Sequence, residues 1–307
     1  MNLRGKRVLV IGGAGFIGSH MTDALIEKGA KVTIVDDFST GEKSNLNSKA
    51  KTIKLNIGSD KFVDVLKKEK PQIVYHFAWF VLVPKSVQDP LLDIDALRGT
   101  IHLLQYARHH KVQKIIFASS GFLYGNNPDL PLKETEKLMP VSPYAITKNA
   151  AENYFEFYRT QFNVPSVIMR YSAAYGPRQR TGAMAAYIRD LKHDRPTEFY
   201  GKKTRDYVYI DDVVSANLKA LDVSDKEKHP VFNIGNGQET VLLDLYKILA
   251  KAMGAKPKAK LCSDRPGEQV RYSLSAAKAS KVLGWKSKTS LEEGLKKTLK
   301  YWEDHEI

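Results

Sequence analysis

The chain has 307 residues, of which 43% are hydrophobic and 27% are charged, a composition typical of a globular protein with an ample core. Its formal net charge is +14, but the lysines and arginines are spread along the whole sequence. The lack of a dense basic block argues against nucleic-acid binding and favours an anionic small-molecule substrate. No apolar run is long enough to cross a membrane.

The only cysteine, Cys262, excludes an internal disulfide and fits a reducing compartment. Met1 runs almost directly into the first predicted strand, which leaves no room for a signal peptide, so we expect a cytoplasmic protein. Histidine and cysteine residues show no metal-ligand spacing, and we expect no metal site.

The segment VLVIGGAGFIG carries the first functional pattern. Residues 7–11 are predicted to form a strand buried on both faces, and residues 16–28 the helix that follows it. Gly12 permits a tight turn between them, Gly15 lets the backbone approach a pyrophosphate, and Gly18 lets the helix lie close to the strand. A glycine turn without a ligand can share this spacing, but the flanking strand and helix favour a dinucleotide site.

A carboxylate follows at the distance that such a site requires. The next strand, predicted over residues 31–35, ends beside Asp36, about twenty residues beyond the glycines. A carboxylate there can accept hydrogen bonds from ribose hydroxyls and would repel a 2′-phosphate. The sequence therefore predicts NAD, rather than NADP, as the cofactor.

The segment SPYAITK supplies a proton-transfer group. Ser142 is a good N-cap and Pro143 a good first helical residue, so Tyr144 and Lys148 are expected to share one helical face. The lysine ammonium is expected to lower the pKa of the tyrosine from its ordinary value near ~10, which would let Tyr144 act as a general base. The same spacing occurs in ordinary exposed helices, but beside a dinucleotide site it indicates oxidation and reduction of a carbinol carbon.

Strand and helix patterns alternate through the first half of the chain. This alternation predicts an α/β fold with a doubly wound parallel sheet, the Rossmann arrangement. The later strands are predicted at residues 51–55, 73–77, 114–118 and 166–170, and the later helices at 61–70, 92–111 and 144–162.

The regular alternation of predicted strands and helices ends at about residue 170. Short strands are predicted at 207–210 and 231–234, and helices at 183–193, 242–253 and 291–303. We expect a smaller mixed α/β cap that closes over the cleft and returns a strand or two to the sheet. The predicted division assigns 1–171, with returning segments near 207–238, to an NAD-binding domain, and 172–206 and 239–307 to a substrate-binding cap.

Further motifs occur in a fixed order along nearly the whole chain. They are GGAGFIG at 12–18, VDDFSTG at 35–41, HFA at 76–78, GT at 99–100, SSGFLYG at 119–125, SPYAITK at 142–148, RYSAAYGPRQ at 170–179, RDYVYIDDVV at 205–214, NIG at 233–235, RPGE at 265–268 and LGW at 283–285. On these motifs the chain resembles the extended short-chain dehydrogenases/reductases of the NAD-dependent epimerase/dehydratase family. Within that family it is most similar to the UDP-glucose (UDP-galactose) 4-epimerases.

The resemblance implies specific roles. Ser120 would hydrogen-bond the reacting hydroxyl, Tyr144 would be the base, and Lys148 would hold the nicotinamide ribose and tune the tyrosine. Arg205 and Arg265 would clamp the diphosphate of a UDP-sugar substrate. The implied NAD site consists of Gly12, Gly15, Phe16, Ile17, Gly18, Asp36, Asp37, Phe38, Ser39, Thr40, Gly41, Asn56, Ile57, Phe77, Ala78, Tyr144, Lys148 and Tyr171.

Some positions depart from the family pattern. Ala96 and Ala173 stand where the family usually has asparagine, Trp79 stands where a small residue is usual, and the segment between Tyr200 and Arg205 is shortened. These departures leave the serine, tyrosine and lysine intact but leave the sugar open.

The sequence thus predicts an NAD-dependent nucleotide-sugar 4-epimerase that acts through a transient 4-keto sugar. A related decarboxylase or reductase stays open, whereas a 4,6-dehydratase is disfavoured because Gly121 and Phe122 replace the acidic pair such enzymes carry. A non-catalytic NAD(H)-binding sensor is the third alternative. The resemblance also implies a homodimer, formed through the helices at 92–111 and 144–162.

Overall fold

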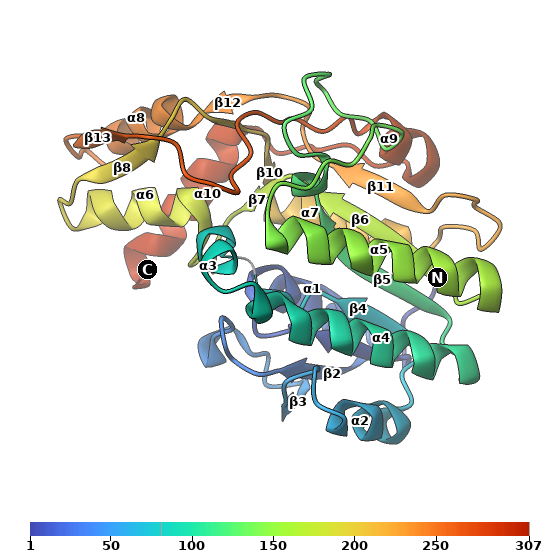
Figure 1. Ribbon diagram of the computed structural model, residues 1–307. Helices are drawn as coiled ribbons and strands as arrows, with labels where there is room; N and C mark the ends of the chain where they lie inside the picture. Colours follow the sequence, from blue (N-terminus) through green and yellow to red (C-terminus); the bar gives the residue numbers. More distant parts are fainter. Residues whose placement is uncertain (81, 307) are drawn as a thin grey trace.

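The computed structural model describes residues 1–80 and 82–306. Its main sheet has seven strands, and each neighbouring pair is parallel (Figure 1). From one edge to the other these strands are β11 (Val231–Ile234), β6 (Ser166–Tyr171), β5 (Lys114–Ser120), β4 (Ile73–His76), β1 (Arg7–Ile11), β2 (Lys31–Asp36) and β3 (Lys51–Lys54). The predicted doubly wound parallel sheet is confirmed.

Successive side chains of the central strand β1 point to opposite faces of the sheet. They contribute to two apolar cores, one on each face. Val8 and Val10 of β1 join the core beneath helix α1 (Phe16–Glu27), whereas Leu9 and Ile11 join the opposite core. Helices α2 (Lys61–Glu69), α4 (Ile94–His109) and α5 (Pro143–Phe162) cover this second face. Helices α7 (Ile210–Ala220) and α9 (Ala277–Leu283) lie with α1 over the first. Burial on both faces explains why these strands are continuous apolar runs.

The remaining elements gather at one end of the main sheet (Figure 1). Helices α6 (Gly182–Lys192), α8 (Leu242–Ala252) and α10 (Leu291–Asp304) lie there with three small two-stranded sheets. These pair β7 (Ala173–Tyr175) with β10 (Tyr207–Tyr209), β8 (Thr197–Tyr200) with β13 (Ala259–Cys262), and β9 (Thr204–Arg205) with β12 (Thr240–Val241). The late strand β11 returns to the edge of the main sheet, as expected, but β10 does not. The division into two domains stays a prediction.

The prediction of a strand over 207–210 is wrong at its end, because Ile210 begins helix α7. This helix was not predicted. Its acidic first turn, Asp211 and Asp212, favours the positive helix N-terminus, and the carboxylate of Asp212 also accepts a hydrogen bond from Thr289 N at 2.9 Å. Helices α3 (Val83–Gln88) and α9 and the short 3-10 helices η1 (Lys43–Asn45), η2 (Pro90–Asp93) and η3 (Gly121–Tyr124) were also missed.

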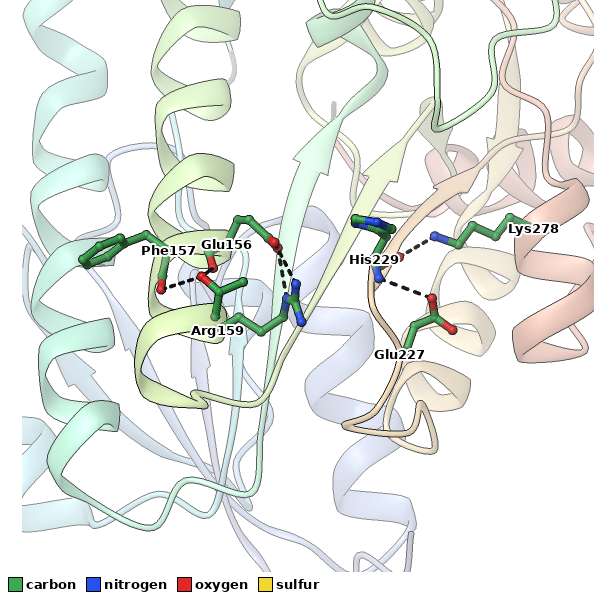
Figure 2. Close-up of polar contacts among 7 residues, drawn as sticks. Glu156, Phe157, Arg159, Glu227, His229 and Lys278 are labelled. Atoms are coloured by element: carbon green, nitrogen blue, oxygen red, sulfur yellow. Dashed lines mark hydrogen bonds and ion pairs between the residues drawn. The ribbon is translucent and has the colours of Figure 1, made fainter.

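Polar contacts lie near the end of the sheet where β6 and β11 begin (Figure 2). In the last part of α5, Arg159 pairs with Glu156 at 2.7 Å. Before β11, the ammonium of Lys278 in α9 donates to the His229 carbonyl, and His229 N donates to Glu227 at 3.3 Å. These contacts lie at the amino ends of the strands, whereas ligands of such sheets bind at the carboxyl ends. No described helix is long and apolar enough to span a membrane.

Candidate active site

A cavity of about 1120 Å³ lies at the carboxyl ends of the central strands. It runs from the glycine-rich turn after β1, past the start of α5, to the arginines beneath α6 and β8. The predicted cofactor, catalytic and diphosphate residues line this cavity, with two exceptions: Phe38 and Gly41 lie outside its lining. One space therefore collects residues that are far apart in the sequence.

The turn between β1 and α1 has no room for side chains. Gly12 has a φ of +81°, and a Cβ there would lie 2.6 Å from Ala78 N. A Cβ on Gly18 would lie 2.1 Å from the Gly12 carbonyl oxygen. Gly15 caps α1 without a side chain, so the first turn of this helix presents its N–H groups and partial positive charge to the cavity. This turn fits the pyrophosphate of a dinucleotide.

The carboxylate of Asp36 lies at the end of β2, on the wall of the same cavity. Its oxygens accept hydrogen bonds from Ala14 N and Phe38 N, both at 2.9 Å. Burial raises the pKa of Asp36, and these two N–H groups lower it. Each carboxylate oxygen has a further lone pair, so Asp36 can also accept ribose hydroxyls.

The side chain of Asn56, one of the expected NAD-site residues, already makes two hydrogen bonds. Its amide Nδ2 donates to Asp95 at 2.9 Å, and its Oδ1 accepts from Gly58 N at 2.7 Å. The cavity lining includes Asn56, Ile57 and Asp95. Asp95 is thus a further polar group beside Asn56 on the cavity wall, and it was not predicted from the sequence.

Helix α5 begins as predicted and delivers the tyrosine and lysine to the cavity. Ser142 Oγ accepts from Ala145 N at 3.3 Å, and Pro143 is the first helical residue. The side chain of Tyr144 is 8% exposed and that of Lys148 is 2% exposed. Ser120 ends β5 on the same cavity wall, and its hydroxyl accepts a hydrogen bond from Phe122 N at 3.2 Å.

The expectation that Lys148 lowers the pKa of Tyr144 is wrong for this state of the protein. Burial raises the pKa of Tyr144 to about 12; the Ser120 hydroxyl lowers it, and the charge of Asp93 raises it. The ammonium of Lys148 is directed elsewhere, because it donates to the Ala118 carbonyl and lies 4.1 Å from the ring centre of Trp79.

Burial also changes the lysine itself. It lowers the pKa of Lys148 to about 7, and the negative charges of Glu152 and Asp93 oppose that shift. The ammonium lies 4.7 Å from the ring centre of Phe117, so two aromatic faces contact it. Lys148 can therefore change protonation state near neutral pH.

The opposite end of the cavity is cationic and aromatic. The guanidinium of Arg265 lies 3.7 Å from the ring centre of Tyr200 and pairs with Glu268. Arg205 lies 5.4 Å from the ring centre of Phe122 and 5.6 Å from that of Tyr272. The structure therefore places both predicted arginines on the cavity wall.

Four further lining residues at this end were missed. Glu268 is the last residue of the RPGE motif, and its carboxylate pairs with Arg265. The motif was therefore the signal from which Glu268 could have been predicted. Lys203 is buried and pairs with the same carboxylate, but it lies in the shortened segment, where no motif marks it. Phe122 and Tyr272 form the aromatic wall, and only their spatial position reveals it.

Comparison with known proteins agrees with this geometry. The model of the NAD dependent epimerase/dehydratase family matches residues 8–235. The UDP-glucose 4-epimerase of Mycolicibacterium smegmatis is 35% identical over 96% of this chain and 98% of its own length. The crystal structure of the Thermotoga maritima UDP-glucose 4-epimerase with UDP-glucose is 37% identical over 97% of this chain and 99% of that chain, with a TM-score of 0.92.

A third comparison includes the cofactor. The UDP-glucuronic acid 4-epimerase of Bacillus cereus, solved with UDP-glucuronic acid and NAD, is 30% identical over 97% of this chain and 99% of that chain, with a TM-score of 0.89. The predicted family resemblance is confirmed. The chain belongs to the NAD-dependent epimerase/dehydratase family, as an epimerase that takes NAD as its cofactor.

Proposed function

We propose that the protein is a nucleotide-sugar 4-epimerase that acts on a UDP-sugar of the glucose/galactose type through a transient 4-keto sugar. The observation that carries this proposal is the cavity itself: Ser120 and Tyr144 share it with the glycine turn at one end and with Arg205 and Arg265 at the other. A dinucleotide and a sugar diphosphate would thus meet at a proton-transfer group.

Tyr144 and Ser120 would handle the proton. In the proposed reaction the Tyr144 phenolate takes the proton of the sugar 4-hydroxyl, and Ser120 holds that oxygen by a hydrogen bond. NAD, held by the glycine turn and Asp36, would supply the acceptor for the C4 hydride and the donor that returns it to the opposite face, and its positive nicotinamide would favour the phenolate. Tyr144 then gives the proton back to the C4 oxygen.

The arginines would supply positioning. Arg205 and Arg265 carry permanent charges suited to the two phosphates, and both are braced against aromatic rings. Holding the diphosphate fixed while the 4-keto sugar turns over would present both faces of C4 to the cofactor. Such positioning lowers the barrier because the reacting atoms stay in place through both half-reactions.

Replacing Tyr144 tests this assignment. Tyr144→Phe should reduce epimerisation at least about a thousandfold while NAD binding persists, because the ring stays and only the proton-transfer group is lost. Tyr154→Phe, on an exposed part of the same helix, is the matched control and should retain activity. Full activity of Tyr144→Phe would refute the role of the base. Bound NAD without turnover in the wild type would favour the sensor alternative.

We also propose that the protein is a homodimer formed through α4 and α5. These adjacent helices carry large exposed apolar side chains, including Ile94, Ile146, Tyr154 and Phe157. Such a surface is commonly buried between two copies related by a two-fold axis. Sedimentation of the wild type and of Ile146→Glu tests this: the variant should shift toward the monomer, and a monomeric wild type would refute the dimer.

A further inference from the structure

A fully buried carboxylate lies behind the catalytic lysine and has no part in the mechanism above. Asp93 ends η2, which packs against α3, α4 and α5. Its Oδ2 accepts from the Ser86 hydroxyl at 2.6 Å. Its Oδ1 is buried without a hydrogen bond of standard geometry among residues 1–80 and 82–306. Leaving a carboxylate oxygen in this condition is costly unless a nearby charge compensates it.

Trp79 is close to both this carboxylate and the lysine. Its side chain is 7% exposed, and its ring faces the ammonium of Lys148 at 4.1 Å. The indole N–H is also buried without a standard hydrogen bond in the described part of the chain, yet it is close enough to Asp93 to lower the pKa of that carboxyl group. Phe117 packs edge-on against the same ring at 5.8 Å, which fixes its orientation.

Two carboxylates raise the pKa of Lys148 by their charge, Glu152 more than Asp93, but of the two only Asp93 has no ion-pair partner in the described part of the chain. Glu152, one turn further along α5, is paired with Arg170 of β6 at 2.6 Å. His76 of β4 is neutral near pH 7, because burial and the Lys148 charge lower its pKa to about 3. Tyr144, whose pKa is raised, is neutral as well. The field of Asp93 from η2 reaches both Lys148 and Tyr144.

We propose that Asp93 and Trp79 are positioning residues for the proposed reaction: the carboxylate is the buried counter-ion of Lys148, and the indole ring holds the ammonium against the Ala118 carbonyl. In this arrangement the lysine is held at the wall of the cavity, beside Tyr144, before any ligand enters. Neither Asp93 nor Trp79 exchanges a proton with the substrate. The inference rests on the proposed function for its kinetic consequence, but the positioning itself can be measured without turnover.

The direct test is the pKa of Lys148, measured by NMR of protein carrying 13C at lysine Cε. The signal is assigned by its loss in Lys148→Met. In Asp93→Asn the pKa of Lys148 should fall by about half a unit or more, since an attractive charge is removed and the shape is kept. The control Asp64→Asn, an exposed carboxylate on α2, should leave it unchanged. An unchanged pKa in Asp93→Asn would overturn the proposal.

A second pair of variants covers the case in which Asp93→Asn does not fold. Trp79→Phe keeps an aromatic face toward the ammonium, whereas Trp79→Leu removes it. The Cε chemical shift and pKa of Lys148 should stay near wild type in the first and change in the second. Equal behaviour of both variants would contradict the role of the ring.

The kinetic readout distinguishes positioning from mere stability. Because the charge of Asp93 raises the pKa of Tyr144, Asp93→Asn should move the acidic limb of the kcat/KM profile to lower pH, with kcat reduced about tenfold and KM for the sugar nucleotide near wild type. A uniform loss of activity at every pH would indicate a structural role only. If the wild type turned over no sugar nucleotide, the proposed function would fail while the NMR result would still decide the positioning.

Discussion

The guanidinium of Arg170 and the carboxylate of Glu152 form a buried ion pair, with Nη2 and Oε2 2.6 Å apart, one helical turn beyond Lys148. Ser119 also donates to this carboxylate, and Arg170 donates to the hydroxyl of Tyr124 at 2.8 Å. The network joins β5, β6 and α5 near the proposed catalytic side chains. It fixes the helix that carries Tyr144 and Lys148 against the sheet.

Breaking this pair should be far more costly than breaking an exposed one. Glu152→Ala leaves the Arg170 charge buried without a partner, and we expect the free energy of unfolding to fall by about 3–5 kcal/mol. The matched control is Glu156→Ala on the same helix, where the partner Arg159 stays near solvent and the expected loss is below about 1 kcal/mol (Figure 2). Urea unfolding of both variants measures the difference, and similar losses would contradict the account.

The buried ammonium of Lys148 should reduce the free energy of unfolding of the protein. Its pKa is about 7 in the folded protein and ordinarily ~10.4 in an unfolded chain, so between these pH values the unfolded state binds a proton that the folded state does not. Stability is therefore lost as the pH falls from about 10 to 7. Lys148→Met should unfold with about 1–2 kcal/mol more stability at pH 6 and with a smaller difference at pH 10.

Unfolding curves at both pH values test the sign of this effect. A stabilisation of Lys148→Met that does not depend on pH would indicate improved packing rather than removal of a buried charge. A destabilised variant at pH 6 would show that the contacts of the ammonium with Ala118 and Trp79 outweigh its burial.

The glycine turn should not tolerate a methyl group at Gly18. A Cβ there would lie 2.1 Å from the Gly12 carbonyl, so Gly18→Ala must displace either the turn or α1, and NAD binding should weaken at least about tenfold. The control Gly254→Ala adds a methyl group at a glycine that has open space around it and lies outside the cavity lining, and this variant should bind NAD normally. Titration of NAD by calorimetry decides, and normal binding by Gly18→Ala would refute the predicted role of the turn.

Arg265 should affect the sugar nucleotide and not the cofactor. Removing its charge with Arg265→Met should raise KM for the UDP-sugar about tenfold or more, whereas the NAD affinity stays near wild type, since the two ligands would occupy opposite ends of the cavity. Arg195→Met removes an exposed arginine outside the cavity lining and is the control. If Arg265→Met lost NAD affinity to the same extent, the arginine would act on the cofactor, which would contradict its assignment to the sugar nucleotide.

The elements with strong local patterns were predicted from the sequence. β1 is an apolar run followed by a glycine turn, and α5 begins with a capping serine and a proline. Each of these elements can therefore be predicted from residues that are adjacent in the sequence. Helix α7 was missed because the aromatic and β-branched run before it, Tyr207–Tyr209, continues into Ile210 without a break. Only tertiary contacts decide where such a run changes from strand to helix.

Most residues that line the cavity were predictable from the sequence, but their electrostatics were not. Motif order identified Tyr144 and Lys148, yet the direction of the lysine ammonium depends on Trp79, which comes from the loop beyond β4. The contribution of Asp93 likewise depends on how η2 packs against α5. Burial, which raises the pKa of Tyr144 instead of lowering it, is a property of the assembled fold.

The proposed 4-epimerisation is tested by a proton NMR time course of the purified protein with NAD and UDP-sugars carrying deuterium at C4: UDP-glucose, UDP-galactose, their N-acetyl forms and UDP-glucuronate. We expect the anomeric signal of the C4 epimer of at least one substrate to grow and the product to retain deuterium at C4, because the hydride leaves and returns within one cavity. Loss of the deuterium to solvent, release of carbon dioxide, or no conversion of any substrate with NAD bound would contradict it.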